Sequence, residues 1–223
     1  MNKTITENRY VQILSMGVRL EGIVSIPDDA KGFVVFVHGS GSSRHSPRNQ
    51  YVAQTLQEGG MATLLFDLLT AEEEELDLRT RQWRFDITTL ATRTAAVLEW
   101  LDLQPFAYGL KKGLFGSGTG AAAALMAAAE LPELVAAVVS RGGLPDLAGQ
   151  KLAEVEAPTL LIVGGRDQTV IDLNEQALSQ LQPGLGAKMI VVTGATHLFE
   201  EPGALEEAAH LSRDWFQRHL SIV

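Results

Sequence analysis

The chain contains no cysteine among its 223 residues, which excludes disulfide bonds, thiolate metal sites and a cysteine nucleophile. Basic residues are too few to balance the acidic ones, and the formal net charge of -9 argues against binding to nucleic acid, whose phosphates such a chain repels. No apolar run is long enough to span a bilayer, and the first residues are polar, unlike a signal peptide. We therefore expect a cytoplasmic protein with no nucleic-acid or membrane partner.

The length and composition are those of an ordinary globular protein. Hydrophobic residues make up 46% of the chain and charged residues 20%, and a domain of this size buries enough surface to form a stable core without disulfide bonds or a structural metal. There is no internal repeat and no linker rich in Pro, Gly or Ser. We predict a single domain over residues 1–223.

The first strands are predicted to form a hairpin. Residues 10–14 and 18–26 read as strands on either side of Ser15, Met16 and Gly17, and two strands joined by so short a turn must be antiparallel. We place this hairpin at one edge of the sheet.

From about residue 32 onward, short apolar runs alternate with helical stretches, which is typical of βαβ units and a mostly parallel sheet. Fully apolar runs predict strands buried on both faces; they cover residues 33–37, 61–66, 113–115, 135–139, 159–163 and 189–192. Helices are predicted over residues 50–56, 85–103, 120–129, 173–181 and 205–220, and the acidic segment 72–75 is predicted to be a solvated surface loop. The expected α/β fold is a twisted sheet of about eight strands with helices on both faces.

A glycine-rich turn follows the predicted strand 113–115. A nucleophile elbow requires small residues two before and two after the nucleophile, because a side chain there would strike the strand or the helix. Gly116 and Gly120 fit these two positions and place Gly118 at the apex, where glycine has no side chain that could attack a substrate. If Ser117 stood at the apex instead, Phe115 would occupy a crowded position for which it is far too large.

The helix that follows this turn contains four consecutive alanines at residues 121–124. A helix with so little side-chain volume can lie very close to a sheet. A central helix behind an active-site turn would need that property.

Further motifs appear in a characteristic order along the chain. They are FVHGSGSSRHSPRN at 36–49, LFG at 114–116, SRGG at 140–143, GGRD at 164–167 and GATHLFEE at 194–201. With these motifs the chain resembles, over nearly its whole length, the dienelactone-hydrolase-like branch of the α/β-hydrolase family. Relatives show Gly-Ala-Ser-Thr-Gly at the elbow, so Gly118 departs from the pattern and puts ordinary catalysis in doubt.

The resemblance implies an α/β-hydrolase fold and hydrolysis of an ester or lactone carbonyl, with no metal or cofactor. In this fold the triad follows the order nucleophile, acid, histidine. Asp167 and His197 each follow a predicted strand and match the acid and the base. Asp167 is also a good N-cap for the next helix, and the two roles are compatible. The backbone N–H groups of Thr119 and Ser40 would form the oxyanion hole.

Arginines follow two of the predicted strands. Arg44, Arg48 and Arg141 lie on loops at the carboxyl ends of strands, where ligands of open α/β sheets bind. They would either contact an anionic substrate or hold the loops through salt bridges, and the sequence leaves both open.

The function predicted from these residues is a hydrolase of the dienelactone hydrolase kind, acting on a small-molecule ester or lactone, whose site is impaired or redesigned because Gly118 is at the apex and the serine lies at Ser117. One alternative is that Ser117 has been recruited as the nucleophile. Another is a non-catalytic small-molecule binding module on the same fold. A third reads Gly116, Gly118 and Ala121 as a dinucleotide-binding G-x-G-x-x-A motif, but it leaves Asp167 and His197 unexplained.

Overall fold

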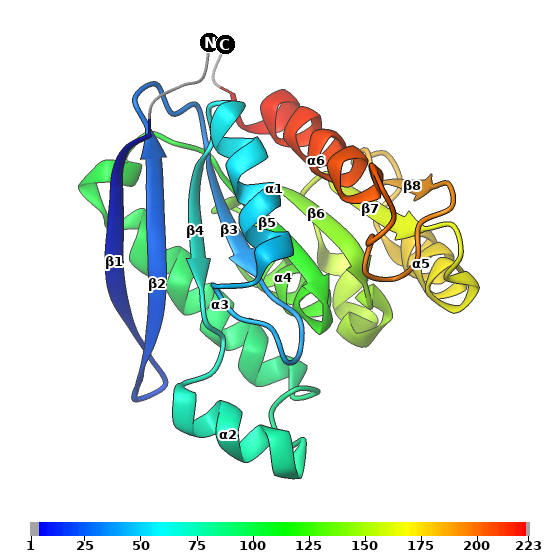
Figure 1. The fold of residues 1–223 in the computed structure, drawn as a ribbon, viewed down its shortest axis with the longest axis horizontal. Coiled ribbons are helices and arrows are strands. Elements are labelled where there is room, and N and C mark those ends of the chain that lie inside the picture. Colours follow the sequence, from blue (N-terminus) through cyan, green and yellow to red (C-terminus); the bar gives the residue numbers. More distant parts are fainter. Residues whose placement is uncertain (1–4, 222–223) are drawn as a thin grey trace.

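A computed structural model describes residues 5–221 and contains one eight-stranded sheet (Figure 1). Its order is β1-β2-β4-β3-β5-β6-β7-β8. The strands are β1 (Ile5–Ser15), β2 (Val18–Pro27), β3 (Phe33–Val37), β4 (Ala62–Phe66), β5 (Lys112–Gly118), β6 (Val135–Gly143), β7 (Thr159–Gly164) and β8 (Lys188–Val192). Strand β2 pairs antiparallel with β1 and with β4, and all the other pairs are parallel. The predicted fold class is confirmed.

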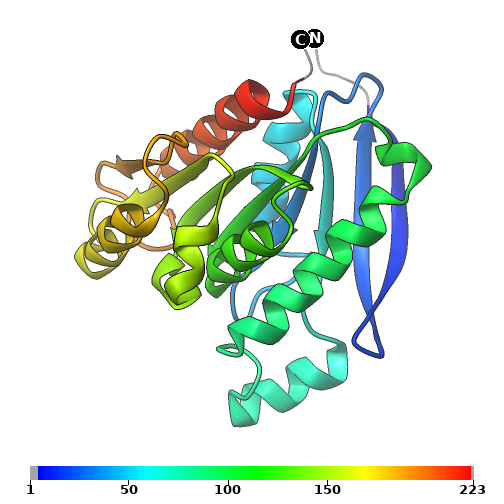
Figure 2. The same cartoon turned by 180° about the vertical axis from the view of Figure 1, so that it is seen from behind.

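Helices cover both faces of the sheet, as the two opposite views show (Figures 1 and 2). The α-helices are α1 (Pro47–Glu58), α2 (Ala71–Thr80), α3 (Ile87–Asp102), α4 (Thr119–Glu130), α5 (Gln168–Gln180) and α6 (Ala204–Leu220), and the short 3-10 segments are η1 (Pro105–Ala107) and η2 (Pro145–Glu154). Helices α1 and α6 contact each other on one face, whereas α3 and α4 pack together on the other. None of the helices within residues 5–221 has the length and apolar character needed to cross a bilayer.

The N-terminal hairpin lies at an edge of the sheet, as predicted. Its turn places Met16 and Gly17 at φ values of 49° and 80°, and a tight two-residue turn with positive φ at both positions matches the twist of the flanking strands. At the opposite edge, the prediction that residues 189–192 are buried on both faces was wrong. Val191 is 40% exposed, because β8 has a neighbouring strand on one side only.

The prediction of a loop at residues 72–75 was also wrong, because these residues belong to helix α2. Thr70 and Glu73 form a capping box, in which each side chain bonds to the backbone N–H of the other residue. The Glu73 carboxylate also pairs with Arg93 of α3 at 2.6 Å. A cap and a partner on another helix thus stabilise a helix that has no strong apolar stripe.

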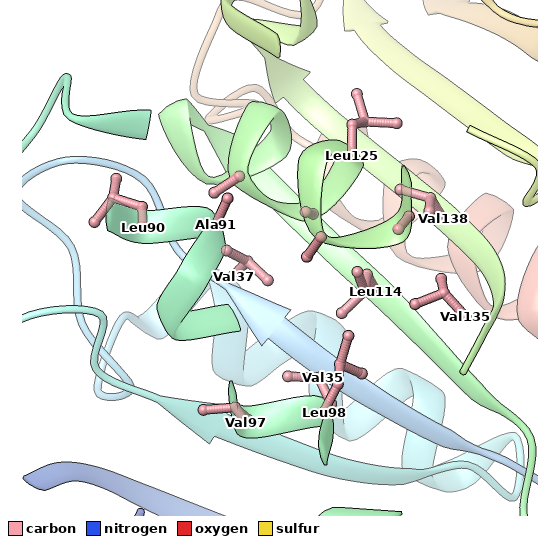
Figure 3. Packing of buried hydrophobic residues seen from close by; sticks show 14 of the residues in the cluster. Val35, Val37, Leu90, Ala91, Val97, Leu98, Leu114, Leu125, Val135 and Val138 are labelled. Atoms are coloured by element: carbon pink, nitrogen blue, oxygen red, sulfur yellow. The ribbon is translucent and has the colours of Figure 1, made fainter. Parts of the chain in front are cut away.

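The alanine-rich helix α4 lies directly against the sheet, as the sequence predicted. Residues 121–124 are fully buried. Figure 3 shows the surrounding core, in which Val35, Val37 and Leu114 of the central strands share one cluster with Ala91 and Leu98 of α3. Close packing of α4 fixes the position of its first turn, where the glycine-rich segment ends.

Candidate active site

The glycine-rich turn joins β5 to α4 and has a steric requirement for glycine at two positions. A Cβ atom at Gly116 would lie 2.5 Å from Ala121 Cα, and one at Gly120 would lie 2.2 Å from the carbonyl oxygen of Val37. Gly118 has φ 53° and ψ -129°, and a Cβ there would meet only Gly39 Cα, at the ordinary distance of 3.5 Å. The flanking positions exclude a side chain, whereas the position between them has room for one.

Asp167 and His197 form a hydrogen-bonded pair. The distance from His197 Nδ1 to Asp167 Oδ2 is 2.9 Å, and because a carboxylate accepts, Nδ1 carries the proton and Nε2 is left free to act as a base. Asp167 follows β7 and also caps α5 by accepting from the Val170 N–H at 3.4 Å. Both roles that the sequence allowed for Asp167 therefore occur together.

His197 and the elbow face a common cavity of about 260 Å³. Of the residues predicted for the site, Ser40, Ser117, Gly118, Thr119, Arg141 and His197 line this cavity. Asp167 reaches it through His197. The roles of these residues in catalysis remain predictions, but their convergence from four separate parts of the chain is a property of the fold.

The two predicted oxyanion donors are in contact. The Ser40 N–H donates to Thr119 Oγ1 at 3.2 Å, and the two hydroxyl groups are 3.0 Å apart. The Thr119 N–H belongs to the first turn of α4, where backbone amides lack partners within the helix. A substrate oxygen bound here would take the place of the Thr119 hydroxyl as the acceptor for Ser40.

The arginines predicted to contact substrate lie in different surroundings. The prediction that all three lie on loops was wrong, because Arg48 belongs to α1 and Arg141 to β6. Arg44 forms ion pairs with Asp67 and Glu21 and is not among the residues that line the cavity. For Arg44 the structure has the salt bridge that was the alternative to substrate contact. Arg48 lines the cavity and pairs with Glu200 at 3.3 Å.

Arg141 is 8% exposed and lacks a carboxylate partner among the described residues. Its Nη2 donates to Asn49 Oδ1 at 3.3 Å, its guanidinium lies 5.7 Å from the centre of the Phe115 ring, and its Nη1 has no hydrogen-bond partner within residues 5–221. Burial, together with the charge of Arg48, lowers the pKa of Arg141 to about 10. The side chain therefore keeps its positive charge at neutral pH.

His38 connects the loops that follow β3 and β4. Its Nδ1 donates to the Gly39 carbonyl and its Nε2 accepts from the Leu68 N–H, both at 2.9 Å. Burial lowers the pKa of His38, despite opposing effects of the Gly39 carbonyl and nearby carboxylates. A buried neutral histidine with both nitrogens bonded to backbone supports the loop that carries Ser40.

Several cavity residues were missed by the sequence analysis. Phe85 was assigned to the start of a helix over 85–103, but α3 begins at Ile87 because Asp86 caps it by accepting from the Thr89 N–H at 3.1 Å. An aspartate before an apolar helical run indicates an N-cap. This signal could have been used to predict that Phe85 lies in the loop before the helix. Other cavity residues that gave no such signal are Ser42, Ser46, Leu144 and Leu198.

The fold and the Asp167–His197 pair define the class of protein. A mostly parallel eight-stranded sheet, a glycine-flanked turn after β5 and an acid and a histidine after β7 and β8 are the arrangement of α/β hydrolases. The model of the dienelactone hydrolase family matches residues 20–222. The chain belongs to the dienelactone hydrolase family.

Solved structures and curated proteins resemble this chain to different degrees. A crystal structure of dienelactone hydrolase from Anabaena variabilis is 55% identical, with a TM-score of 0.93, and the match covers 96% of this chain and 98% of that one. Est1E from Butyrivibrio proteoclasticus has a TM-score of 0.77 at 15% identity, covering 94% of this chain and 98% of Est1E, and supports the fold alone. A Mycobacterium tuberculosis protein named "Putative phosphoribosyl transferase" is 56% identical over 210 residues, which are 94% of this chain but 46% of that protein. The chain thus spans about half the length of the curated relatives it matches.

Proposed function

We propose that this chain is a hydrolase of the dienelactone hydrolase kind, acting on ester or lactone carbonyls of small molecules, and that its turnover is low because Gly118 occupies the nucleophile position. The observation that carries the proposal is the Asp167–His197 pair, which faces the same cavity as the elbow. The steric demands at Gly116 and Gly120 support the register that puts Gly118 at the apex.

Without a serine at the apex, the attacking group is water. His197 Nε2 takes a proton from this water as its oxygen bonds to the carbonyl carbon, and Asp167 stabilises the resulting imidazolium. The Thr119 and Ser40 N–H groups hold the oxyanion. When the intermediate collapses, the carbon–oxygen bond to the leaving group breaks and His197 returns its proton to that oxygen. In triad enzymes, sites that lose the triad retain roughly 10³–10⁴-fold acceleration over water.

The name of the Mycobacterium tuberculosis relative does not change this proposal. That protein is more than twice as long as the region it shares with this chain, and the shared region belongs to a hydrolase family. We therefore assign hydrolysis, and not phosphoribosyl transfer, to the present chain.

The test is to measure hydrolysis of 4-nitrophenyl acetate and of a small aryl lactone by four proteins. They are the present chain, Gly118→Ser, Gly118→Ala and Gly118→Ser combined with His197→Gln. We expect Gly118→Ser to raise kcat/KM by at least about 100-fold, a small part of the roughly 10⁶-fold that a complete triad contributes in subtilisin. Gly118→Ala introduces the same backbone strain without a nucleophile and should leave the rate low.

Loss of the gain in the double variant would link the new serine to His197. A folded Gly118→Ser protein that hydrolyses neither substrate faster than the present chain would contradict the proposal.

A second candidate function is a small-molecule binding module that has lost the chemistry. It is favoured by Gly118, since an apex without a side chain removes the covalent step while the cavity is kept. A present chain that does not exceed the buffer rate, beside a Gly118→Ser variant that gains activity, would favour this candidate.

A further inference from the structure

The cavity beside the elbow has a charge opposite to that of the chain as a whole. The chain carries a formal net charge of -9, yet the charged lining residues are Arg48 and Arg141, and within residues 5–221 no aspartate or glutamate lines the cavity. Local positive potential inside an acidic protein attracts and retains anions. The cavity is therefore set apart electrostatically from the surrounding surface.

Arg141 provides the strongest evidence that an anion belongs in this cavity. Its guanidinium is buried and charged, and the neutral Asn49 amide and the Phe115 ring are its neighbours. A buried charge is costly unless an opposite charge and hydrogen bonds compensate it, and Nη1 has no hydrogen-bond partner within residues 5–221. A ligand anion in the cavity would supply both.

A second guanidinium lies close to the first. The charge of Arg48 is near enough to lower the pKa of Arg141, so the two cations repel each other when no anion lies between them. Arg48 pairs with Glu200 at 3.3 Å, and both of these side chains are substantially exposed to water. An exposed pair of this kind contributes little, so Arg48 can turn from Glu200 to a ligand at low cost.

The number of donors distinguishes between kinds of anion. A carboxylate has two oxygens, which one arginine can bind in a bidentate arrangement. A phosphoryl group has three terminal oxygens and close to two negative charges at neutral pH, and it matches two guanidinium groups supplemented by hydroxyls. The Ser42 and Ser46 side chains belong to the same cavity wall and can supply those hydroxyls.

We propose that this cavity binds a phosphorylated ester or lactone, whose phosphate monoester group is held by Arg48 and Arg141 next to the Asp167–His197 pair that acts on its carbonyl. The inference deepens the proposed function by naming the substrate class, and it rests on that function only for the statement that the bound molecule is a substrate. Binding itself needs no turnover.

The experiment is a calorimetric titration of the purified full chain with inorganic phosphate at pH 7.5 and constant ionic strength, in which acetate serves as a carboxylate competitor. The variants are Arg141→Gln and Arg48→Gln. Arg79→Gln, which removes an exposed charge on α2 outside the cavity, is the control with the same change in net charge. We expect saturable phosphate binding at about 1 mM, weakened roughly tenfold or more by Arg141→Gln, less by Arg48→Gln, and unchanged by Arg79→Gln.

Three results would overturn the proposal: no saturable phosphate binding, equal phosphate affinity in both cavity variants and the control, or acetate binding as tight as phosphate. If Arg141→Gln does not fold, as circular dichroism would show, Arg48→Gln decides the outcome, because its side chain is 40% exposed and its removal leaves the core intact. A chain that binds phosphate but hydrolyses nothing after Gly118→Ser would refute the proposed function and leave this inference standing. The reverse result would refute this inference alone.

Discussion

Alanine substitutions at Gly118 and Gly120 separate the two steric roles within the elbow. At Gly120 a Cβ atom would lie 2.2 Å from the Val37 carbonyl oxygen and 2.3 Å from the His38 carbonyl oxygen. Both obstacles are backbone atoms at the end of a central strand, so relief requires the strand or the helix to move by roughly 1 Å. Overpacking a well-packed site costs about 1–3 kcal/mol and sometimes more, and we place Gly120→Ala at about 3 kcal/mol or above.

At Gly118 the cost comes from the backbone alone. The nearest atom to a new Cβ is at 3.5 Å, and a non-glycine residue at φ 53° and ψ -129° is strained by about 1–3 kcal/mol. Alanine lowers the conformational entropy of the unfolded chain, which offsets roughly 0.4–1 kcal/mol of this strain. The net destabilisation of Gly118→Ala is therefore about 1–2 kcal/mol, clearly below that of Gly120→Ala.

Urea denaturation followed by circular dichroism measures both values, and thermal unfolding gives an independent ranking. For a chain of this size, 1 kcal/mol corresponds to roughly 2–4 °C in Tm. We expect a decrease of about 2–8 °C for Gly118→Ala and a decrease at least about 2 °C larger for Gly120→Ala. Equal destabilisation, or a near-neutral Gly120→Ala, would refute the register that places residue 118 at the apex.

Three further predictions concern stability and the acid–histidine pair. Asp77 accepts hydrogen bonds from the Trp83 and Arg84 N–H groups and pairs with Arg84 Nε at 2.8 Å. Asp77→Asn should therefore lower the free energy of unfolding by about 2–4 kcal/mol in urea titrations, and an unchanged free energy would show that these bonds do not stabilise the fold. Burial lowers the pKa of His38 below its ordinary value of 6.5, so the unfolded chain binds more protons below pH 6.5, and the stability that His38 contributes above that pH is lost as the pH falls through its folded pKa. The free energy of unfolding, measured at several pH values, should therefore depend less on acid pH in His38→Gln, and an unaltered dependence would contradict the lowered pKa of His38. In the Gly118→Ser background, Asp167→Asn should reduce kcat by up to about 10⁴-fold, because the wrong histidine tautomer is favoured; an unchanged kcat would separate the acid from the chemistry.

The sequence predicted most of the fold because the relevant information is local. A strand buried on both faces needs a short run of apolar residues, and five of the six such runs lie in buried parallel strands. The turn between β5 and α4 was predictable for a similar reason, since the steric conflict at Gly116 and Gly120 involves chain segments that every elbow brings together. The exposed edge strand β8 was misjudged because its place in the sheet depends on strand order, which an apolar run does not encode.

The surroundings of individual side chains could not be predicted in the same way. Arg44 follows β3 and Arg141 lies near the end of β6, but Arg44 meets Asp67 after β4 and Glu21 within β2, whereas Arg141 meets a neutral asparagine and an aromatic ring. Only the three-dimensional arrangement decides which arginine is already neutralised. The same holds for Phe85, which reaches the cavity because a cap at the next residue starts α3 after it.

The central claim, a hydrolase site with glycine in place of its nucleophile, is tested most directly by treating the present chain and Gly118→Ser with a fluorophosphonate probe and measuring intact mass. The account predicts that Gly118→Ser gains the mass of one probe, located at residue 118 by peptide mapping, and that the present chain gains none. Labelling of the present chain at Ser117 would contradict it, because Ser117 would then be the nucleophile.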